Sequence, residues 1–276
     1  MRRITWCPLF LSAALAVSGL PLASSAATAS IQAGIGTLSE NHQEVLLAGY
    51  RGFRLRVRTS RYRSGGFRRG GSCLVNQGDQ VAVVAPPARS EEVESTLTGL
   101  APSEVGPVDV TASAHPTFLV NVPDLEGAAT AELTIQHEDY TRADAEVVNM
   151  SFELNGQPGI VAIQVPQSET ALEPGSKYLW QLAIKCESES ALDNSSNLVV
   201  DSWIEREAID ASPTGSLQDQ LAFYAERGIW QETAGTLAQL RYQFPDDPAI
   251  ASDWQALMQD VGLDEFAAVP VVQMVQ

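Results

Sequence analysis

The stretch LEPGSKYLWQLAIKC, residues 172–186, decides the fold class of this chain. From Tyr178 onward, apolar and polar side chains alternate, and Trp180, Leu182 and Ile184 share the face of Tyr178. A period of two is typical of a β-strand with one buried face. Cys186 continues the same phase, so we expect it to face the core or the end of the sheet.

Similar alternation surrounds this strand on both sides. Further strands are predicted near residues 81–85, 118–122, 133–135, 148–154, 160–165 and 198–204. Gly, Pro, Asn and Asp separate them, and about seven short strands with frequent turns indicate a β-sandwich. Pro174, Gly175 and Tyr178 resemble the tyrosine corner of immunoglobulin-like and fibronectin-like domains, in which the tyrosine hydroxyl bonds back to the turn backbone. We therefore expect such a sandwich over residues 73–212.

After residue 213 the apolar period becomes helical. The three expected stripes are Leu217, Leu221, Tyr224 and Ala225; Trp230, Ala234, Leu237 and Ala238; and Ile250, Trp254, Leu257, Met258 and Val261. Gly228 is a candidate C-cap, and Asp247 before Pro248 predicts an N-cap and first helical residue. The first two stripes resemble a tetratricopeptide helix-turn-helix, with one further helix, although an ordinary helical hairpin that caps a sheet fits equally well. The fold class is thus mainly β with α, with residues 213–276 as a helical C-terminal unit.

The first 26 residues predict a signal peptide. Arg2 and Arg3 precede a short apolar run, and Ser24, Ser25 and Ala26 supply small residues for cleavage. The run is shorter than the ~20 residues that span a bilayer, although a retained anchor is the alternative. No later segment predicts a transmembrane helix in the mature chain, so we expect a periplasmic or secreted protein.

A basic segment precedes an acidic body. The whole chain has a formal net charge of -17. From residue 70 onward, seven Lys and Arg stand against thirty-two Asp and Glu, whereas residues 27–69 carry eight basic and two acidic residues. The basic residues of this arginine arm are Arg51, Arg54, Arg56, Arg58, Arg61, Arg63, Arg68 and Arg69. Its Arg, Gly and Ser content predicts that residues 27–72 are a disordered linker.

Three interpretations of the arginine arm stay open. It is a soluble spacer, a segment that folds back onto the acidic body, or a segment that binds anionic envelope surfaces, for which arginine suits phosphate contacts. Arginines interleaved with aromatic residues also resemble single-strand nucleic-acid binders, but export argues against that partner and the acidic body argues against nucleic acid in general.

The two cysteines beyond the signal segment are Cys73 and Cys186. An exported chain with two cysteines favours one disulfide, and closing so long a loop would contribute roughly 4–5 kcal/mol. Two buried free thiols are the alternative. Two distant cysteines and scattered histidines do not reproduce zinc spacing, so we predict no metal site.

No motif for a cofactor or a catalytic nucleophile stands out, and we predict no cofactor and no catalytic residue. His115 is expected to be a structural histidine bonded to backbone, with a catalytic base as the alternative. Glu138 and Asp139 are expected in a solvated turn. Trp203 and Trp254, with Trp230, lie on apolar faces and are expected to be buried in the core.

Several motifs together resemble the exported, mostly cyanobacterial family called domain of unknown function 928. They are GGSC at 70–73, HPTF at 115–118, GQPGIV at 156–161, YLW at 178–180, IKC at 184–186, WI at 203–204, YAERGIW at 224–230 and DWQAL at 253–257. The family has no assigned activity, so the resemblance implies a class and a compartment without a mechanism. Residues 89–107 look like an acidic insertion that loops out.

The sequence therefore favours an exported non-enzymatic module that binds an unknown envelope protein. The alternative is an envelope enzyme or carbohydrate-binding module that uses His115 and nearby carboxylates. A pocket that joins His115 to a carboxylate would favour the alternative, and an exposed apolar helix face would favour the protein partner.

Overall fold

Two β-sheets and three α-helices make up the described part of the chain. The computed structural model describes residues 58–60, 74–76, 79–86, 106–186, 198–209 and 213–276, all within the compact unit that spans residues 38–276. The larger sheet has six strands, in the spatial order β1 (Arg58–Ser60), β3 (Gly106–Thr111), β9 (Leu198–Arg206), β8 (Lys177–Cys186), β5 (Ala129–His137) and β6 (Glu146–Glu153). The smaller sheet has four, in the order β10 (Val271–Val275), β7 (Gly159–Gln164), β4 (Thr117–Val122) and β2 (Ala82–Val83). The helices are α2 (Leu217–Arg227), α3 (Trp230–Gln243) and α4 (Pro248–Asp260), followed by the 3-10 helix η3 (Asp264–Phe266).

Most neighbouring strands in both sheets run antiparallel. The exceptions are β3 beside β9 and β10 beside β7, which are parallel pairs. Both parallel pairs join segments that are far apart in the sequence, because parallel neighbours need a long connection. The longest ladders, β5 with β8 and β8 with β9, form the centre of the larger sheet.

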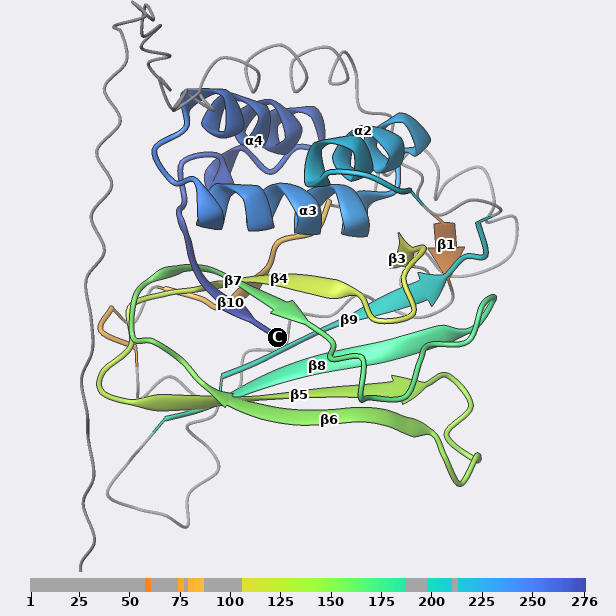
Figure 1. Cartoon of the computed structure of the whole chain (residues 1–276). Helices are drawn as coiled ribbons and strands as arrows, with labels where there is room; N and C mark the ends of the chain where they lie inside the picture. The colour runs from red at the N-terminus through yellow and green to blue at the C-terminus, as the bar shows by residue number, and fades with distance from the viewer. Residues whose placement is uncertain (1–57, 61–73, 77–78, 87–105, 187–197, 210–212) are drawn as a thin grey trace, which may run out of the picture. The chain divides into compact units, whose positions relative to one another are not determined.

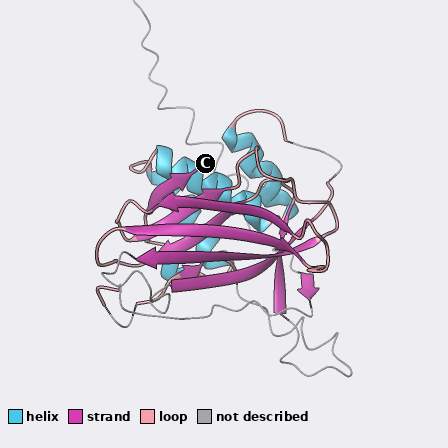
Figure 2. Ribbon diagram, turned by 90° about the horizontal axis from the view of Figure 1, so that it is seen from below, coloured by secondary structure: helices cyan, strands magenta, loops and turns pink. Residues whose placement is uncertain are grey.

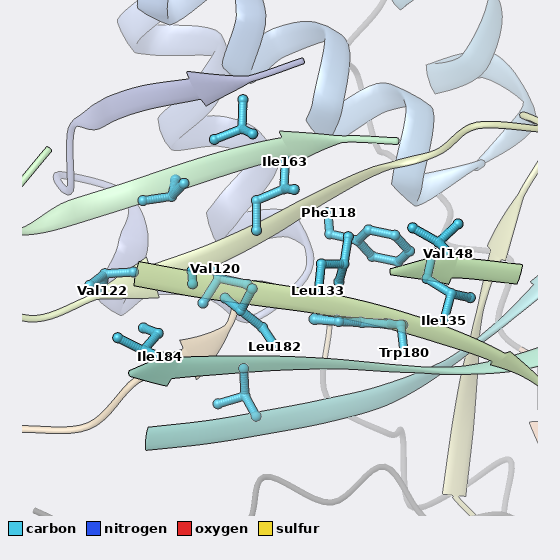
Figure 3. Close-up of a cluster of buried hydrophobic side chains, with 14 of the residues drawn as sticks. Phe118, Val120, Val122, Leu133, Ile135, Val148, Ile163, Trp180, Leu182 and Ile184 are labelled. Carbon is cyan, nitrogen blue, oxygen red and sulfur yellow. The ribbon is translucent and has the colours of Figure 1, made fainter. Parts of the chain in front are cut away.

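The main core lies between the two sheets. The alternation predicted for β8 is observed, with Tyr178, Trp180, Leu182 and Ile184 each at most 2% exposed. Figure 3 shows how Trp180, Leu182 and Ile184 meet residues of β4, β5, β6 and β7. At its centre the rings of Phe118 and Trp180 lie 4.6 Å apart between centroids. The strongest sequence signal therefore corresponds to the best-packed part of the molecule.

A second core lies between the smaller sheet and the helices. Leu119, Ile160 and Ala162 face the helices, whereas their neighbours Val120 and Val161 face the larger sheet. Strands β4 and β7 are thus buried on both faces, and the molecule has three layers (Figures 1 and 2). The apolar stripes of all three helices contribute to this second core, with Leu221, Leu237 and Trp254 at 0 to 1% exposure. The helices therefore use their apolar faces to cover the sheet.

Local signals set the helix ends as the sequence predicted. Gly228 ends α2 with φ of 66°, a left-handed conformation that glycine adopts without strain. Asp247 caps α4 by accepting hydrogen bonds from two backbone N–H groups, and Pro248 is its first residue. The backbone N–H of Glu173 donates to the Tyr178 hydroxyl at 2.7 Å, as expected of the tyrosine corner. The expected burial of Trp203 and Trp254, which are 5% and 0% exposed, is also confirmed.

The structure differs from the sequence predictions at three strands. Strand β10 ends the segment predicted to be a helical unit, because its backbone pairs with the free edge of β7. Strand β3 begins at Gly106, within the segment predicted to loop out, and pairs with β9. Strand β1 lies inside the segment predicted to be disordered, where its three residues pair with the edge of β3. Each of these strands pairs with a segment far away in the sequence, and the alternation of the buried Val108 and Val110 with Asp109 in β3 is a signal that was not used.

The general class, mainly β with three C-terminal helices, is confirmed. The immunoglobulin-like and tetratricopeptide-like details stay predictions, as does the division at residues 73 and 213. None of the helices in the described ranges combines the length and the apolar character that crossing a membrane requires.

Candidate functional site

A buried carboxylate connects the first turn of α3 to the segment between β3 and β4. Glu232, the third residue of α3, places its Oε1 where three donors of this segment converge. The Thr111 hydroxyl donates to Oε1, and so do the backbone N–H groups of Ala112 and Ser113, at 3.1 and 3.0 Å. This contact fixes the connection between β3 and β4 beneath the helices.

Close packing of α3 on β4 holds Glu232 in place. The side-chain amide of Gln231 donates to the carbonyl of Thr117. At Gly235, one turn further on, a Cβ atom would lie 3.1 Å from the Cβ of Thr117, so the helix backbone approaches the strand as closely as a residue without a side chain allows. The hydroxyl of Thr233 donates back to the carbonyl of Ile229 at 2.7 Å. The start of α3 is therefore rigidly positioned.

The two oxygens of Glu232 have different surroundings. Oε1 accepts three hydrogen bonds, whereas Oε2 is buried and has no partner among the described residues. Burial raises the pKa of Glu232, and the bonds from Thr111, Ala112 and Ser113 oppose that rise only in part. Burial therefore shifts the carboxyl group toward its neutral form relative to a solvent-exposed glutamate. A buried polar atom without a partner costs about 1–3 kcal/mol, and such atoms often mark functional sites.

A pocket of about 160 Å³ opens between the helices and the smaller sheet at this point. We call it the Glu232 pocket. Hydrogen-bonding side chains dominate its lining, and the most frequent type is glutamine: Gln164, Gln220, Gln231 and Gln239. His115, Tyr224 and Glu232 also line it. Burial and the nearby Glu232 raise the pKa of Tyr224, so its hydroxyl stays protonated.

His115 lines the pocket but is already engaged through one ring nitrogen. Its Nε2 lies 3.1 Å from the carbonyl oxygen of Glu169. A carbonyl only accepts, so Nε2 carries the hydrogen, and in the neutral ring Nδ1 is the remaining acceptor. This backbone contact is the one expected of a structural histidine. The pocket nevertheless joins His115 to a carboxyl group, which is the arrangement expected under the alternative function.

A second pocket, of about 350 Å³, lies on the other side of Ser113 and Tyr224, which line both. We call it the Arg206 pocket. Arg206 ends β9, where its backbone pairs with the tyrosine corner: its N–H donates to Ser176 and its carbonyl accepts from Gly175. Its Nη1 donates to the carbonyl of Leu172, and its Nε is buried without a partner in the described ranges. Two adjacent pockets thus contain a carboxyl group and a guanidinium that each have an unused polar atom.

Other predicted polar positions have structural roles. Asp139 lies exposed in a turn, where Thr141 donates to it through both its backbone N–H and its hydroxyl. These bonds lower the pKa of Asp139, as expected of a solvated turn. His137 accepts a hydrogen bond at Nδ1 from the N–H of Asp139, at 2.9 Å. Within the described residues, no group of three or more metal-ligating side chains gathers.

The predicted site residues near the N-terminus are mostly outside the described part. Cys186 ends β8 and is disulfide-bonded. Cys73 lies outside the described residues, so its pairing with Cys186 stays a prediction. In the arginine arm, only Arg58 lies in a described segment, as the first residue of β1. The other arginines, namely Arg51, Arg54, Arg56, Arg61, Arg63, Arg68 and Arg69, lie outside it, and the role of the arm is untested.

The sequence analysis did not identify Glu232, Arg206 or the glutamines of the pocket. A glutamate at the third position of a helix is common, because it caps the helix start. Glu232 instead bonds to a segment about 120 residues away, which no local pattern reveals. One usable signal is the polar pair Gln231 and Glu232 between the buried Trp230 and Thr233.

Comparison with known protein families gives one result. A family model described as Domain of Unknown Function (DUF928) matches residues 64–271, well over half of the chain. No curated protein matches the sequence. The expected family is thereby confirmed, whereas export and a cyanobacterial source stay predictions.

Proposed function

The chain belongs to the family of Domain of Unknown Function 928, and we propose that it is a binding module which holds one hydroxyl-rich unit of a ligand, such as a sugar ring, in the Glu232 pocket. One observation carries the proposal. Four glutamines, a tyrosine and a carboxyl group with an unused oxygen converge on one small pocket.

The chemistry of the lining matches a polyhydroxylated ligand. A glutamine amide has two N–H donors and an acceptor, and each sugar hydroxyl both donates and accepts. Gln220 and Gln231 each use an amide donor on a backbone carbonyl, of Gly215 and Thr117. Tyr224 adds an aromatic ring with a polar tip, which suits a ring that is apolar on its faces and polar at its edge. The volume of about 160 Å³ is below the ~300–1,000 Å³ of typical ligand pockets, which favours a single ring-sized unit.

The lining of the Glu232 pocket fits sugar binding better than it fits glycoside hydrolysis. Glycoside hydrolysis usually needs two carboxyl groups on opposite sides of the scissile bond. Among the described residues that line the Glu232 pocket, Glu232 is the one carboxyl group. His115 donates through Nε2 to Glu169, which supports a positioning role. The envelope enzyme is therefore the second choice, and turnover of a bound sugar would be its signature.

The helices favour the pocket over an apolar docking surface. Their apolar stripes are buried against the smaller sheet. The large apolar side chains exposed at the end of α3 are Tyr242 and Phe244. Localisation in the periplasm or outside the cell is part of the same proposal, because envelope polymers there are rich in sugars.

Calorimetric titration tests the proposal. The purified chain is titrated with neutral di- and trisaccharides of glucose, galactose and N-acetylglucosamine. We expect at least one to bind, and Gln239→Ala to weaken its affinity by about 2- to 10-fold, the effect of one neutral hydrogen bond. Gln243→Ala, one turn along α3 and exposed, is the matched control and should not change the affinity.

Two outcomes would contradict the proposal. One is the absence of binding tighter than about 1 mM by any sugar of the panel. The other is equal affinity in the Gln239 and Gln243 variants, which would place the ligand elsewhere. Release of shorter sugars during the titration would show that the protein is an enzyme and not only a binding module.

A further inference from the structure

Arg206 is a partly buried cation without an ion-pair partner in the described part of the chain. The contact recorded for its guanidinium is the bond from Nη1 to the carbonyl of Leu172. Its Nε is buried without a partner. Partly buried charges are usually paired, because removal from water is otherwise costly. This cation lacks such a partner although acidic residues greatly outnumber basic ones from residue 70 onward.

The side chain of Arg206 lies at a pocket. Ser113, Pro174 and Ile209 are among the residues that line the Arg206 pocket, whose volume is about 350 Å³. Glu207 also lines it but has an interaction of its own. With Nη1 on the carbonyl of Leu172 and Nε shielded from solvent, Nη2 is the guanidinium nitrogen that remains for a charge-assisted hydrogen bond with an anion.

The Arg206 pocket adjoins the Glu232 pocket. Ser113 and Tyr224 line both, so one ligand can pass over Tyr224 and occupy both at once. The first pocket offers neutral hydrogen-bonding groups, and the second offers a cation. A ligand that satisfies both carries a hydroxyl-rich unit and, beside it, an anionic group.

We propose that the Arg206 pocket is an anion subsite of the same binding site, and that the ligand is an acidic oligosaccharide in which a uronic-acid carboxylate contacts Arg206. The inference rests on the proposed sugar-binding function, since it names the class of sugar. Carboxylate, sulfate and phosphate esters share the anionic chemistry that a guanidinium binds, and the test below distinguishes them.

The test compares matched ligands on the unaltered full chain. Titrations use an oligogalacturonate trisaccharide, its fully methyl-esterified form, and neutral, sulfated and phosphorylated trisaccharides. Salt is kept near 0.15 M, where a Debye length of about 8 Å screens distant acidic residues. We expect the free acid to bind at least about 10-fold tighter than its ester, the effect of one charge-assisted hydrogen bond.

Variants then test whether Arg206 causes the preference for the acid over its ester. Arg206→Gln should abolish the preference for the acid, so that the acid and its ester bind with equal affinity. Arg206→Lys keeps the positive charge but lacks the planar guanidinium, so this variant should keep part of the preference for the acid. Arg227→Gln, an exposed arginine on α2, is the matched control and should behave like the unaltered chain. Melting temperatures show which variants are folded, and the acid–ester comparison in the unaltered chain needs no variant.

The outcomes separate the two proposals. Equal affinity for acid and ester, with neutral sugars bound, would overturn the anion subsite and leave the proposed function intact. Tighter binding of sulfated or phosphorylated sugar than of the uronate would overturn the carboxylate assignment. A preference for acid that persists in folded Arg206→Gln would overturn the role of Arg206. Binding of no sugar would overturn the proposed function and this inference together.

Discussion

Individual buried polar residues in this chain fall into two kinds. Glu232 and Arg206 each line a pocket and have a buried polar atom without a hydrogen-bond partner among the described residues. Asp253, on α4, is 1% exposed, has a buried Oδ2 without a partner in the described ranges, and lines neither of these pockets. The first kind supports function, whereas the second has consequences for stability only.

Because Asp253 is buried, we predict that the free energy of unfolding decreases as the pH rises. Burial, together with the nearby Asp247, raises its pKa from 3.8 to about 6. Well below pH 4 the group is neutral in both the folded and unfolded states. Between pH 4 and about 6 the unfolded state loses its proton first, so the free energy of unfolding falls as the pH rises. Asp253→Asn should therefore stabilise the protein at pH 8, by up to about 3 kcal/mol.

Urea unfolding at pH 4 and pH 8 measures this effect. The gain from Asp253→Asn should appear at pH 8 and largely vanish at pH 4. Asp260→Asn, at the exposed end of the same helix, serves as the control. An Asp253 variant that is less stable than the unaltered chain at pH 8 would show that the buried group is ionised and stabilised by something else.

At the scale of elements, the joint between β7 and β10 is the most constrained. Gly159 starts β7 with φ of 149°, and a Cβ atom there would lie 2.7 Å from a methyl carbon of Val272 and 2.8 Å from the carbonyl oxygen of Pro270. The same carbonyl accepts the N–H of Ile160 at 2.8 Å. A side chain at this position would therefore separate β10 from the sheet.

We predict that Gly159→Ala lowers the free energy of unfolding by about 2 kcal/mol or more, because it adds backbone strain and a steric clash. Gly156→Ala, three residues earlier, is the matched control. Gly156 also has a positive φ, of 76°, but nothing lies within 4 Å of its added Cβ. Gly156→Ala should lower the free energy of unfolding by about 1 kcal/mol, because alanine is strained at a positive φ even where no steric clash occurs. Equal losses in the two variants, measured by urea unfolding, would show that β10 does not pack against β7 as described.

Sequence patterns predicted the elements that have an apolar face. The alternation in β8 and the helical stripe from Ile250 to Val261 are each set by side chains close together in the chain. Strands β1, β3 and β10 were missed because each pairs with a strand far away in the sequence; β1 and β10 lie at sheet edges, whereas β3 lies between β1 and β9. The candidate site was missed for the same reason, since Glu232 and Arg206 acquire their roles from segments far away in the sequence.

At the scale of the whole molecule, the stacking of three layers creates the site. The β3–β4 connection runs between the tyrosine corner and the start of α3, and both pockets open beside it. The helical stripes are used to cover the sheet, so polar residues at the border between helix and sheet remain available for a ligand. The pairing of Cys73 with Cys186 would join the start of this body to the end of β8.

The arginine arm gives a prediction about the full mature chain. We propose that it binds anionic envelope components weakly, since basic residues contribute about 1 kcal/mol each near an anionic surface. Replacing all eight arginines with glutamine should abolish co-sedimentation with anionic phospholipid vesicles and leave β1 able to pair through its backbone. Raising salt to 1 M, where the Debye length is ~3 Å, should release the unaltered chain. Equal sedimentation of both chains, or binding that survives 1 M salt, would leave the arm as a spacer.

The central claim, that the Glu232 pocket holds a hydroxyl-rich ligand, is tested most directly by nuclear magnetic resonance of the glutamine side-chain amides. The spectrum of the full chain is followed during titration with the tightest-binding neutral sugar of the panel. The account predicts that the amide signals of Gln164, Gln220, Gln231 and Gln239 shift together, while those of the exposed Gln243 and Gln255 stay in place. Signals that shift only outside the pocket, or no shifts at all, would contradict it.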